Sequence, residues 1–292
     1  MSRRARRIAV LGHIRRAQVR REAVRLRRRL GRQRLEVRFE ERLAAEMGIE
    51  GRPLSALASW CDLLVTLGGD GTVLSGARAM VGRRGALLPV NLGGLGFLAA
   101  AEASETDEAI AAAIAGRWRP VRRRVLSAVV TRRGKVLRRS TAMNDAVVKS
   151  AGGYSAVHLR LYALGQDLGH LVADGLIAAS AGGSTAYSLS AGGPVLSPDI
   201  EAVVVTPVSP HSLGSRPLVL PGHADVRVKV LGGYDRTVLL LDGQESVDLE
   251  ARDEVRIQLD RRAVRLIQNP DRVFTFTLRK KLGWQGSAKR SL

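Results

Sequence analysis

A short glycine-rich segment with a single carboxylate is the strongest chemical signal in the sequence: residues 68–72 read Gly-Gly-Asp-Gly-Thr. Glycines permit positive φ angles and let backbone N–H groups approach a phosphate closely. A helix that starts after this turn would direct its positive end at the same place. The Asp70 carboxylate would repel a phosphate, so it suits a proton acceptor for an attacking hydroxyl, or a metal contact. The alternative is an ordinary Asp-Gly turn between a strand and a helix.

A second group of small and hydroxyl-bearing residues follows an Asp-Gly-Leu-Ile stretch at residues 174–177. Residues 182–194 read GGSTAYSLSAGGP, and their hydroxyl and backbone groups offer hydrogen-bond donors to a polar ligand. The Tyr187 ring offers a surface on which a nucleobase could stack. The alternative is a capped helix start with a buried tyrosine. The sequence has no G-x-x-x-x-G-K or G-x-G-x-x-G motif, which excludes a P-loop enzyme and a standard Rossmann dehydrogenase.

The elements that must position these residues alternate in the first part of the chain. Apolar strands are expected at residues 7–12, 34–39, 62–67 and 87–91, and helices at residues 14–30, 72–81 and 105–115. In the first helix one face is apolar and consists of Val19, Ala23, Leu26 and Leu30. Alternating strands and helices predict a Rossmann-like α/β domain with a parallel sheet, in which the 68–72 loop follows a buried strand.

The pattern changes near Pro120, where short strands punctuated by Gly, Pro and Asp begin. This part predicts a β-rich second domain with one helical interruption near residues 184–191. The expected strands lie at residues 125–131, 146–149, 157–162, 203–206, 226–231, 238–242, 255–259 and 264–267. The C-terminal tail is expected to return to the first domain. The predicted domains are therefore residues 1–118 with 275–292, and residues 119–274.

Length and composition limit the class of protein. The chain has 292 residues, of which 45% are hydrophobic, and this is enough for two domains with buried cores. A single cysteine, Cys61, excludes an internal disulfide framework and a structural zinc cluster. The sequence shows no apolar run of membrane-spanning length and no secretion signal. We therefore expect a cytoplasmic protein without a membrane partner.

The net charge of +20 is concentrated at the two ends of the chain. Residues 1–38 hold fifteen Arg against two Glu, and residues 279–292 hold five basic residues and no acidic one. The remainder is nearly neutral, which is not the pattern of a domain that reads a nucleic-acid groove. We expect these charges to be solvated, with nonspecific polyanion binding as a side effect and no specific nucleic-acid partner.

Taken together, the motifs resemble the NAD kinase family, whose members use ATP or polyphosphate. The resemblance covers nearly the whole chain. The Gly-Gly-Asp-Gly-Thr loop alone is shared with diacylglycerol kinases, sphingosine-type lipid kinases and, loosely, phosphofructokinases. The matching segments lie at residues 10–13, 68–72, 91–98, 144–145, 174–194, 210–213, 216–218, 242–244 and 281–284.

The resemblance implies a role for each matching residue. Asp70 accepts the proton of the 2′-hydroxyl on the adenosine ribose, and Gly71 lies beside the substrate. The donor's phosphates are bordered by Gly68, Gly69, Gly71 and Thr72. The substrate is held by Asn144 and Asp145, with Asp174 near the nicotinamide half, Gln244 as a further contact, and Thr185, Ala186, Tyr187, Ser188, Leu189 and Ser190 around the dinucleotide. Mg²⁺ or another divalent cation arrives with ATP, so no metal ligand from the protein is expected.

Three features depart from the family's usual pattern. The family's Thr-Pro-Thr before Gly-Ser-Thr-Ala-Tyr reads Ser-Ala-Gly at residues 180–182. Asp145 stands where Glu is commoner, and Val172 occupies a place where many relatives have Arg. These changes could alter affinity or donor preference, but they leave Asp70 and its loop intact.

We therefore expect an enzyme that phosphorylates NAD⁺ to NADP⁺ with ATP or polyphosphate, and that forms a homodimer or homotetramer as its relatives do. There are two alternatives: a lipid kinase that shares the loop, and a nonenzymatic module that binds dinucleotides or polyanions. Either donor, and either NAD⁺ or NADH as acceptor, is compatible with these residues.

Overall fold

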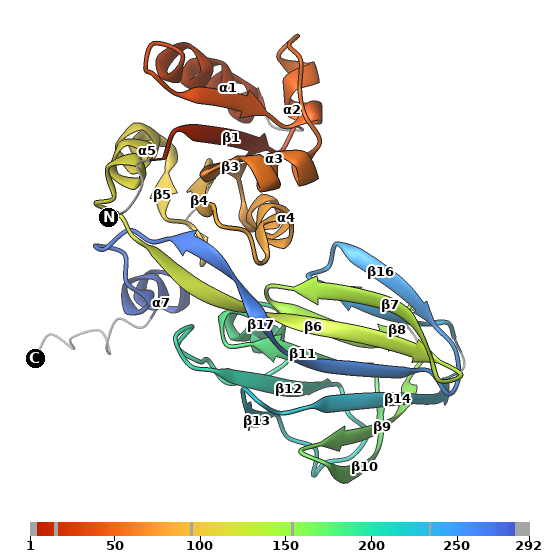
Figure 1. Cartoon of the computed structure of the whole chain (residues 1–292). Helices are drawn as coiled ribbons and strands as arrows, with labels where there is room; N and C mark the ends of the chain where they lie inside the picture. Colours follow the sequence, from red (N-terminus) through yellow and green to blue (C-terminus); the bar gives the residue numbers. More distant parts are fainter. Residues whose placement is uncertain (1–4, 15–16, 94–95, 153–154, 234, 284–292) are drawn as a thin grey trace, which may run out of the picture. The chain divides into compact units, whose positions relative to one another are not determined.

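The computed structural model describes residues 5–14, 17–93, 96–152, 155–233 and 235–283 (Figure 1). The chain divides into two units, of which the first comprises Met1–Arg122 and Val264–Leu292, and the second Arg123–Ala263. The domain limits expected at residues 118 and 275 stay a prediction. The motif residues Gly94, Leu95 and Trp284 lie outside the described part of the chain.

The first unit is built on a parallel sheet, as the alternation of strands and helices predicted. Its strands are β1 (Arg7–Gly12), β2 (Glu36–Phe39), β3 (Leu63–Gly68), β4 (Ala86–Asn91) and the short β5 (Ala101–Glu102). They pair in the order β2-β1-β3-β4, and β5 pairs with the end of β4. β3 and β4 are buried along their whole length, which explains their continuous apolar sequence.

Helices cover both faces of this sheet. They are α1 (Ala17–Leu30), α2 (Glu41–Glu46), α3 (Leu54–Trp60), α4 (Asp70–Met80) and α5 (Thr106–Ala115), with a 3₁₀ turn η1 (Ala103–Glu105) before α5. A further helix of this unit, α7 (Phe274–Leu282), lies near the C-terminus. The expected apolar face of α1 is confirmed, since Val19, Ala23, Leu26 and Leu30 are buried in one core cluster with Val65. α4 lies on the opposite face, where a Cβ built at Gly76 would be 2.8 Å from Cγ2 of Thr66.

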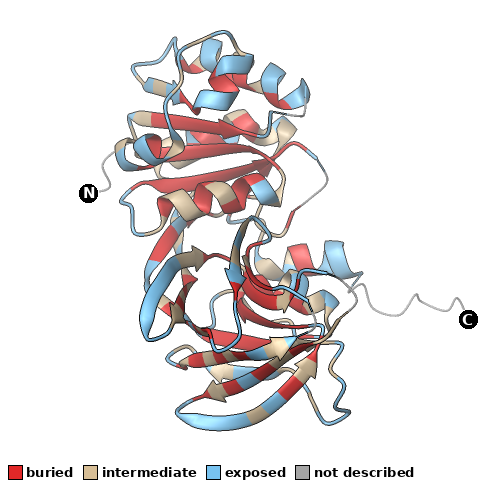
Figure 2. Ribbon diagram, turned by 90° about the vertical axis from the view of Figure 1, so that its right-hand side faces the viewer, coloured by how far each residue is buried: buried red, intermediate tan, exposed pale blue. Residues whose placement is uncertain are grey.

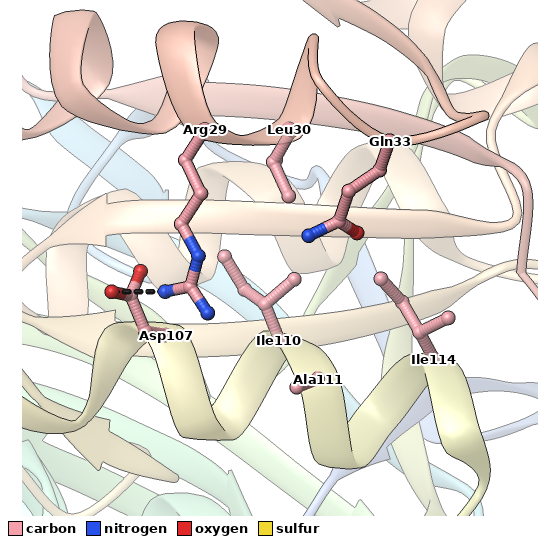
Figure 3. Close-up of a pocket in the computed structure, with 7 residues that line it drawn as sticks. All are labelled: Arg29, Leu30, Gln33, Asp107, Ile110, Ala111 and Ile114. Atoms are coloured by element: carbon pink, nitrogen blue, oxygen red, sulfur yellow. Dashed lines mark ion pairs between the residues drawn. The ribbon is translucent and has the colours of Figure 1, made fainter.

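The Arg-rich helix α1 lies beside α5 (Figure 3). Arg29 forms an ion pair with Asp107 of α5, and Leu30 and Ile110 line the small cavity next to this pair. Arg25 also pairs with Asp107, with 2.7 Å between Nη1 and Oδ2. Some of the basic residues at the start of the chain thus have carboxylate partners within the protein.

The second unit consists of antiparallel strands in two sets. The first set is a six-stranded sheet with the order β13-β12-β11-β8-β15-β16, and the second has the order β10-β9-β14-β17, with β6 paired to β17 and β7. The strands are β6 (Pro120–Arg132), β7 (Lys135–Ala142), β8 (Asp145–Ser150), β9 (Val157–Ala163), β10 (Gln166–Ala173), β11 (Gly175–Ser180), β12 (Ala202–Val208), β13 (Leu218–Pro221), β14 (Val226–Gly233), β15 (Thr237–Leu241), β16 (Glu245–Leu249) and β17 (Glu254–Ile267). β6 and β17 contain residues of both units.

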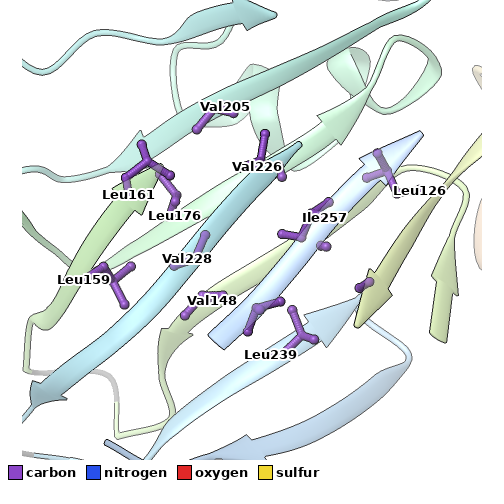
Figure 4. Close-up of a cluster of buried hydrophobic side chains, with 14 of the residues drawn as sticks. Leu126, Val148, Leu159, Leu161, Leu176, Val205, Val226, Val228, Leu239 and Ile257 are labelled. Atoms are coloured by element: carbon purple, nitrogen blue, oxygen red, sulfur yellow. The ribbon is translucent and has the colours of Figure 1, made fainter. Parts of the chain in front are cut away.

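The core of the second unit contains side chains from both sets of strands (Figure 4). Val148 of β8, Leu176 of β11 and Leu239 of β15 join Leu159 of β9 and Ile257 of β17 in one buried cluster. Buried residues alternate with half-buried or exposed ones along β9 and β14, as expected for a sheet with one face on the core. Figure 2 shows such alternation of buried and less buried residues along strands of the protein.

The structure adds elements that the sequence pattern did not predict. The elements that were not expected are α2, α3, α7, β5, β7, β10, β11, β13 and β16. The two strands expected at residues 255–259 and 264–267 form the single strand β17. Most residues of β7 and β13 are exposed, so they lack the alternating pattern that identifies a half-buried strand. The helix expected at residues 184–191 is a 3₁₀ turn, η2 (Gly182–Thr185), followed by the short α6 (Tyr187–Ser190).

Candidate functional site

The glycine-rich segment forms the turn between β3 and α4. Gly69 is the N-cap of α4, and Asp70 is its first residue. A Cβ built at Gly68 would lie 2.4 Å from Oγ1 of Thr72, so this turn closes only around a residue without a side chain. The positive dipole end of α4 is therefore directed at the edge of the sheet where β3 ends. The binding of donor phosphates by this loop stays a prediction.

The Asp70 carboxylate is half-buried beside this turn. The backbone N–H groups of Phe97 and Leu98 donate hydrogen bonds to it. Its Oδ1 atom is buried and has no hydrogen-bond partner among the described residues. The chain passes close to Oδ1 at Gly96, where only glycine fits, because a Cβ built there would lie 2.3 Å from that oxygen. One carboxylate oxygen is thus left for a group that the free protein does not supply.

Burial raises the pKa of Asp70 above its usual value, while the charge of Lys281 and the hydrogen bonds from Phe97 and Leu98 oppose that rise. A raised pKa makes a carboxylate a better proton acceptor, provided that it stays ionised at the working pH. The environment of Asp70 therefore suits a general base.

The loop at residues 68–72 contains one acidic side chain, Asp70, that could bind a divalent metal ion. The described residues contain no group of three or more His, Cys, Asp or Glu side chains that could hold a metal ion. Mg²⁺ is commonly bound by one or two carboxylates together with substrate phosphates. Asp70 with its unpartnered oxygen fits a magnesium ion that arrives on the donor. The expectation that the protein supplies no metal ligands stays a prediction.

In the second unit, the predicted substrate residue Asn144 lies in the turn between β7 and β8, and Asp145 is the first residue of β8. Asp242 holds this turn. The Asp242 carboxylate accepts hydrogen bonds from the backbone N–H groups of Met143 (2.9 Å), Asn144 (2.7 Å) and Asp145 (3.2 Å). Asp242 follows β15 and has a φ of 51°, a left-handed conformation that aspartate tolerates better than most residues. It is an ordered clamp on the two predicted substrate residues.

Two polar groups of this turn have unusual environments. Oδ1 of Asn144 is buried and has no hydrogen-bond partner in the described part of the chain. Asp145 is 5% exposed. Burial and the nearby charge of Asp242 raise its pKa to about 7, against a hydrogen bond from the backbone N–H of Tyr187. Near neutral pH, a carboxyl group with such a pKa can accept a hydrogen bond from a ligand hydroxyl when it is ionised, and can donate one to it when it is protonated.

The end of β11 and the segment that follows it pack directly on this turn. The backbone N–H of Ser180 donates to the carbonyl oxygen of Asn144 at 2.8 Å. The Ser180 hydroxyl donates to the Met143 carbonyl oxygen (2.6 Å) and accepts from the N–H of Gly183 (3.0 Å). A Cβ built at Gly183 would lie 2.0 Å from the Asn144 carbonyl oxygen. The structure thus brings Asn144 and Asp145 together with the segment that begins at Gly183.

The predicted dinucleotide segment divides into structural and accessible residues. The Ser188 hydroxyl lies 2.8 Å from that of Thr206 and is buried. Tyr187 is 42% exposed, so its ring is open to a ligand, unlike the buried tyrosine of the alternative interpretation. Of the other predicted residues, Thr185, Ala186 and Leu189 are half-buried and Ser190 is exposed.

Asp174 and Gln244 occupy exposed positions of the second unit. Asp174 lies between β10 and β11, and its backbone N–H donates to the Val208 carbonyl oxygen at 3.0 Å. Gln244 lies in the turn that contains Asp242, and its N–H donates to the Leu241 carbonyl oxygen at 2.9 Å. The roles of both residues stay predictions.

The sequence predicts no role for Asp242, although this residue belongs to the matching segment 242–244. The available signal was an Asp-Gly pair directly after an apolar strand, which indicates a turn. The three backbone partners of its carboxylate precede it by about a hundred positions, so only the fold shows them. Ser180 was noted as a departure from the family pattern, and the structure shows that its hydroxyl joins two segments of the site.

Comparisons with known proteins match both units to domains of one family. The family models that match are the ATP-NAD kinase N-terminal domain, at residues 54–118, and the ATP-NAD kinase C-terminal domain, at residues 143–269. A curated NAD kinase of Desulforamulus reducens is 39% identical over 259 residues, which are 88% of this chain and 90% of that protein. A curated NAD kinase of Solibacter usitatus is 38% identical over 256 residues, which are 87% of this chain and 89% of that protein.

Solved structures agree in fold. The crystal structure of a yeast NADH kinase complexed with NADH has a TM-score of 0.91 and 26% identity, and the match covers 99% of this chain and 91% of that one. An NAD kinase from Archaeoglobus fulgidus in complex with ATP has a TM-score of 0.76 and 24% identity, with 95% and 97% covered, and shows the same fold.

The fold, the phosphate loop and these relatives define a phosphotransferase with an alcohol acceptor. The chain belongs to the NAD kinase family. The matches favour neither a lipid kinase nor a nonenzymatic binding module. No helix in the described part of the chain is long and apolar enough to cross a membrane.

Proposed function

We propose that this enzyme transfers the terminal phosphoryl group of ATP to the 2′-hydroxyl of the adenosine ribose of NAD⁺, giving NADP⁺ and ADP. The observation that carries the proposal is the position of Asp70. Asp70 lies within the glycine-rich loop at residues 68–72 and is the first residue of α4, and its carboxylate has a buried oxygen that lacks a partner among the described residues.

The loop and Asp70 divide the work of the reaction. Backbone N–H groups around Gly68, Gly69, Gly71 and Thr72 bind the donor's phosphates, aided by the dipole of α4. Asp70 takes the proton of the 2′-hydroxyl while the ribose oxygen forms its bond to the terminal phosphorus. The bond from that phosphorus to the bridging oxygen breaks, and ADP leaves with the electron pair. Mg²⁺, when bound with ATP, neutralises phosphate charge.

The second unit holds the dinucleotide. Asn144 contributes its buried side-chain oxygen, and Asp145 contributes a carboxyl group that bonds ribose hydroxyls. The exposed ring of Tyr187 stacks on a base, which is worth about 1–3 kcal/mol in other nucleotide sites. Asp174 contacts the nicotinamide half and Gln244 makes a further contact. The yeast NADH kinase that shares this fold was crystallised with NADH, which supports a dinucleotide as the acceptor.

We also make proposals about the phosphoryl donor, the cellular compartment and the oligomeric state of the enzyme. ATP is the donor suggested by the ATP-NAD kinase family models, with polyphosphate as the second candidate. We also propose a cytoplasmic homodimer or homotetramer, without a membrane or specific nucleic-acid partner.

One assay tests the proposed reaction. Purified protein is incubated with Mg²⁺, NAD⁺ or NADH, and either ATP or polyphosphate, and the product is measured with an NADP-specific dehydrogenase. Mass spectrometry of the product checks that it has gained one phosphate. NADP⁺ formation from ATP and NAD⁺ supports the proposal, whereas absence of phosphorylated dinucleotide with both donors and both acceptors refutes it.

A further inference from the structure

The phosphate loop contains one acidic side chain and no basic one. Residues 68–72 contribute glycine backbone, a threonine hydroxyl and the Asp70 carboxylate. The terminal phosphates of a nucleoside triphosphate are anionic, and a carboxylate a few ångströms away repels them. Backbone N–H groups and a helix end supply only partial charges. A full positive charge from another element would offset this repulsion.

Lys281, in the last turn of α7, brings such a charge to the loop. Its Nζ lies 5.9 Å from the centroid of the Phe97 ring, and the backbone N–H of Phe97 donates to the Asp70 carboxylate. Burial raises the pKa of Asp70, and the charge of Lys281 opposes that rise. Both observations place the ammonium group in the electrostatic environment of the catalytic carboxylate.

The helix that carries Lys281 is anchored in the first unit. Arg272, just before α7, donates to the Glu105 carboxylate at 2.7 Å and lies 3.6 Å from that of Glu102. Leu278 and Thr277 of α7 are buried. Lys281 itself is exposed. The anchored helix thus presents a side chain that a ligand can reach.

We propose that Lys281 binds the terminal phosphates of the donor and holds them beside Asp70. This inference rests on the proposed function and adds a residue to it. Lysine is a compact point charge on a flexible stem, which suits a phosphate group that moves from donor to acceptor. The ammonium group offsets the repulsion between those phosphates and Asp70, and it transfers no proton.

Lys280 provides a matched control within the same helix. It has the same charge and is also exposed. Its Nζ lies 5.0 Å from the centroid of the Phe276 ring, within α7 itself. A general effect of positive charge on α7 would therefore appear in both variants, whereas phosphate binding would appear only at Lys281.

The test compares Lys281→Met, Lys281→Arg and Lys280→Met with the wild type. Initial rates are measured against ATP at saturating NAD⁺ and against NAD⁺ at saturating ATP, and calorimetry measures ATP binding directly. A charged contact to phosphate is worth about one power of ten. We expect Lys281→Met to raise the KM and Kd for ATP about tenfold and to leave the KM for NAD⁺ within about twofold. Lys281→Arg recovers most of the affinity, and Lys280→Met matches the wild type.

Three results would overturn the role of Lys281. They are an unchanged Kd for ATP in Lys281→Met, an equal loss in Lys280→Met, or a parallel rise of both KM values with a lower Tm, which would indicate a structural role. Failure of the proposed function is a separate result, namely wild-type protein that forms no NADP⁺. The calorimetric comparison of ATP binding still tests Lys281 in that case.

Discussion

Asp242 fixes Asn144 across the second unit: Oδ1 of its carboxylate accepts a hydrogen bond from the Asn144 backbone N–H at 2.7 Å. The same carboxylate also accepts from Met143 and Asp145. A charged acceptor with three backbone donors sets the conformation of the turn. The proposed substrate contacts of Asn144 and Asp145 depend on that conformation.

Replacement of this carboxylate tests its positioning role. Asp242→Asn keeps the size of the side chain but leaves one acceptor oxygen in place of two, so at least one backbone N–H loses its partner. We expect the free energy of unfolding to fall by about 1–3 kcal/mol. We also expect the KM for NAD⁺ to rise about tenfold while that for ATP changes little. Steady-state kinetics and urea unfolding measure these effects.

Asp248→Asn is the matched control, because it makes the same substitution at an exposed position of β16. It should leave both KM values and the free energy of unfolding near those of the wild type. A KM for NAD⁺ that is unaffected in Asp242→Asn would rule out the positioning role.

The buried carboxyl group of Asp145 should make stability depend on pH. Its pKa is raised to about 7 in the folded protein, chiefly by burial and then by Asp242, against an ordinary value of 3.8. The folded state therefore holds this proton more tightly than the unfolded state. The resulting stabilisation is present below about pH 4 and is lost as the pH rises through about 7.

Asp145→Asn removes this titration and serves as the reference. We expect the free energy of unfolding of the wild type to fall relative to that of Asp145→Asn between pH 5 and pH 8. The fall is about 1.4 kcal/mol for each pH unit from pH 5 up to the folded-state pKa, and it levels off above that pKa. Urea unfolding at both pH values measures it. A difference between the two proteins that does not change with pH would contradict the prediction.

The contact between Gly183 and Asn144 gives a prediction with a neighbouring control. Gly183→Ala places a Cβ 2.0 Å from the Asn144 carbonyl oxygen and 2.4 Å from its carbon, both of which are backbone atoms. The turn must move, so we expect a loss of about 3 kcal/mol or more in unfolding free energy and a much weaker affinity for NAD⁺.

Gly182→Ala changes the adjacent residue in the same way without this clash. The nearest atom to a Cβ at Gly182 is Oγ of Ser180 at 3.8 Å, an ordinary contact. We expect its unfolding free energy within about 1 kcal/mol of the wild type. Thermal unfolding of both variants and calorimetry with NAD⁺ check the pair, and equal stability of the two alanine variants would refute the close-packing argument.

The sequence was most informative where local pattern and burial coincide. β1, β3 and β4 are buried strands with continuous apolar sequences, and the phosphate loop follows β3 directly, so strand and loop could be predicted together. The apolar face of α1 was predictable for the same reason, because helical periodicity places its four buried residues on one side. By contrast, β7 and β13 are exposed and become strands only through pairing with their neighbours.

In the candidate site, too, local sequence patterns identify single residues but not their partners from distant segments. Asp70 could be identified from its own loop, because glycines on both sides of a carboxylate are a local signal. The hydrogen bonds that it accepts from Phe97 and Leu98, and the charge of Lys281 that lowers its pKa, come from other segments of the chain. The clamp formed by Asp242 likewise joins two turns on neighbouring strands, β8 and β15. Such pairings depend on strand order, which residue patterns alone do not specify.

The central claim is that the Asp70 carboxylate accepts the proton of the ribose hydroxyl, and Asp70→Asn tests it most directly. The amide keeps the size of the side chain and cannot act as the base. We predict that NADP⁺ formation falls by at least about 100-fold, the usual range for loss of a general base. Calorimetry should show that NAD⁺ binds with nearly wild-type affinity. Full turnover in Asp70→Asn would contradict the account, because the proton would then have to go elsewhere.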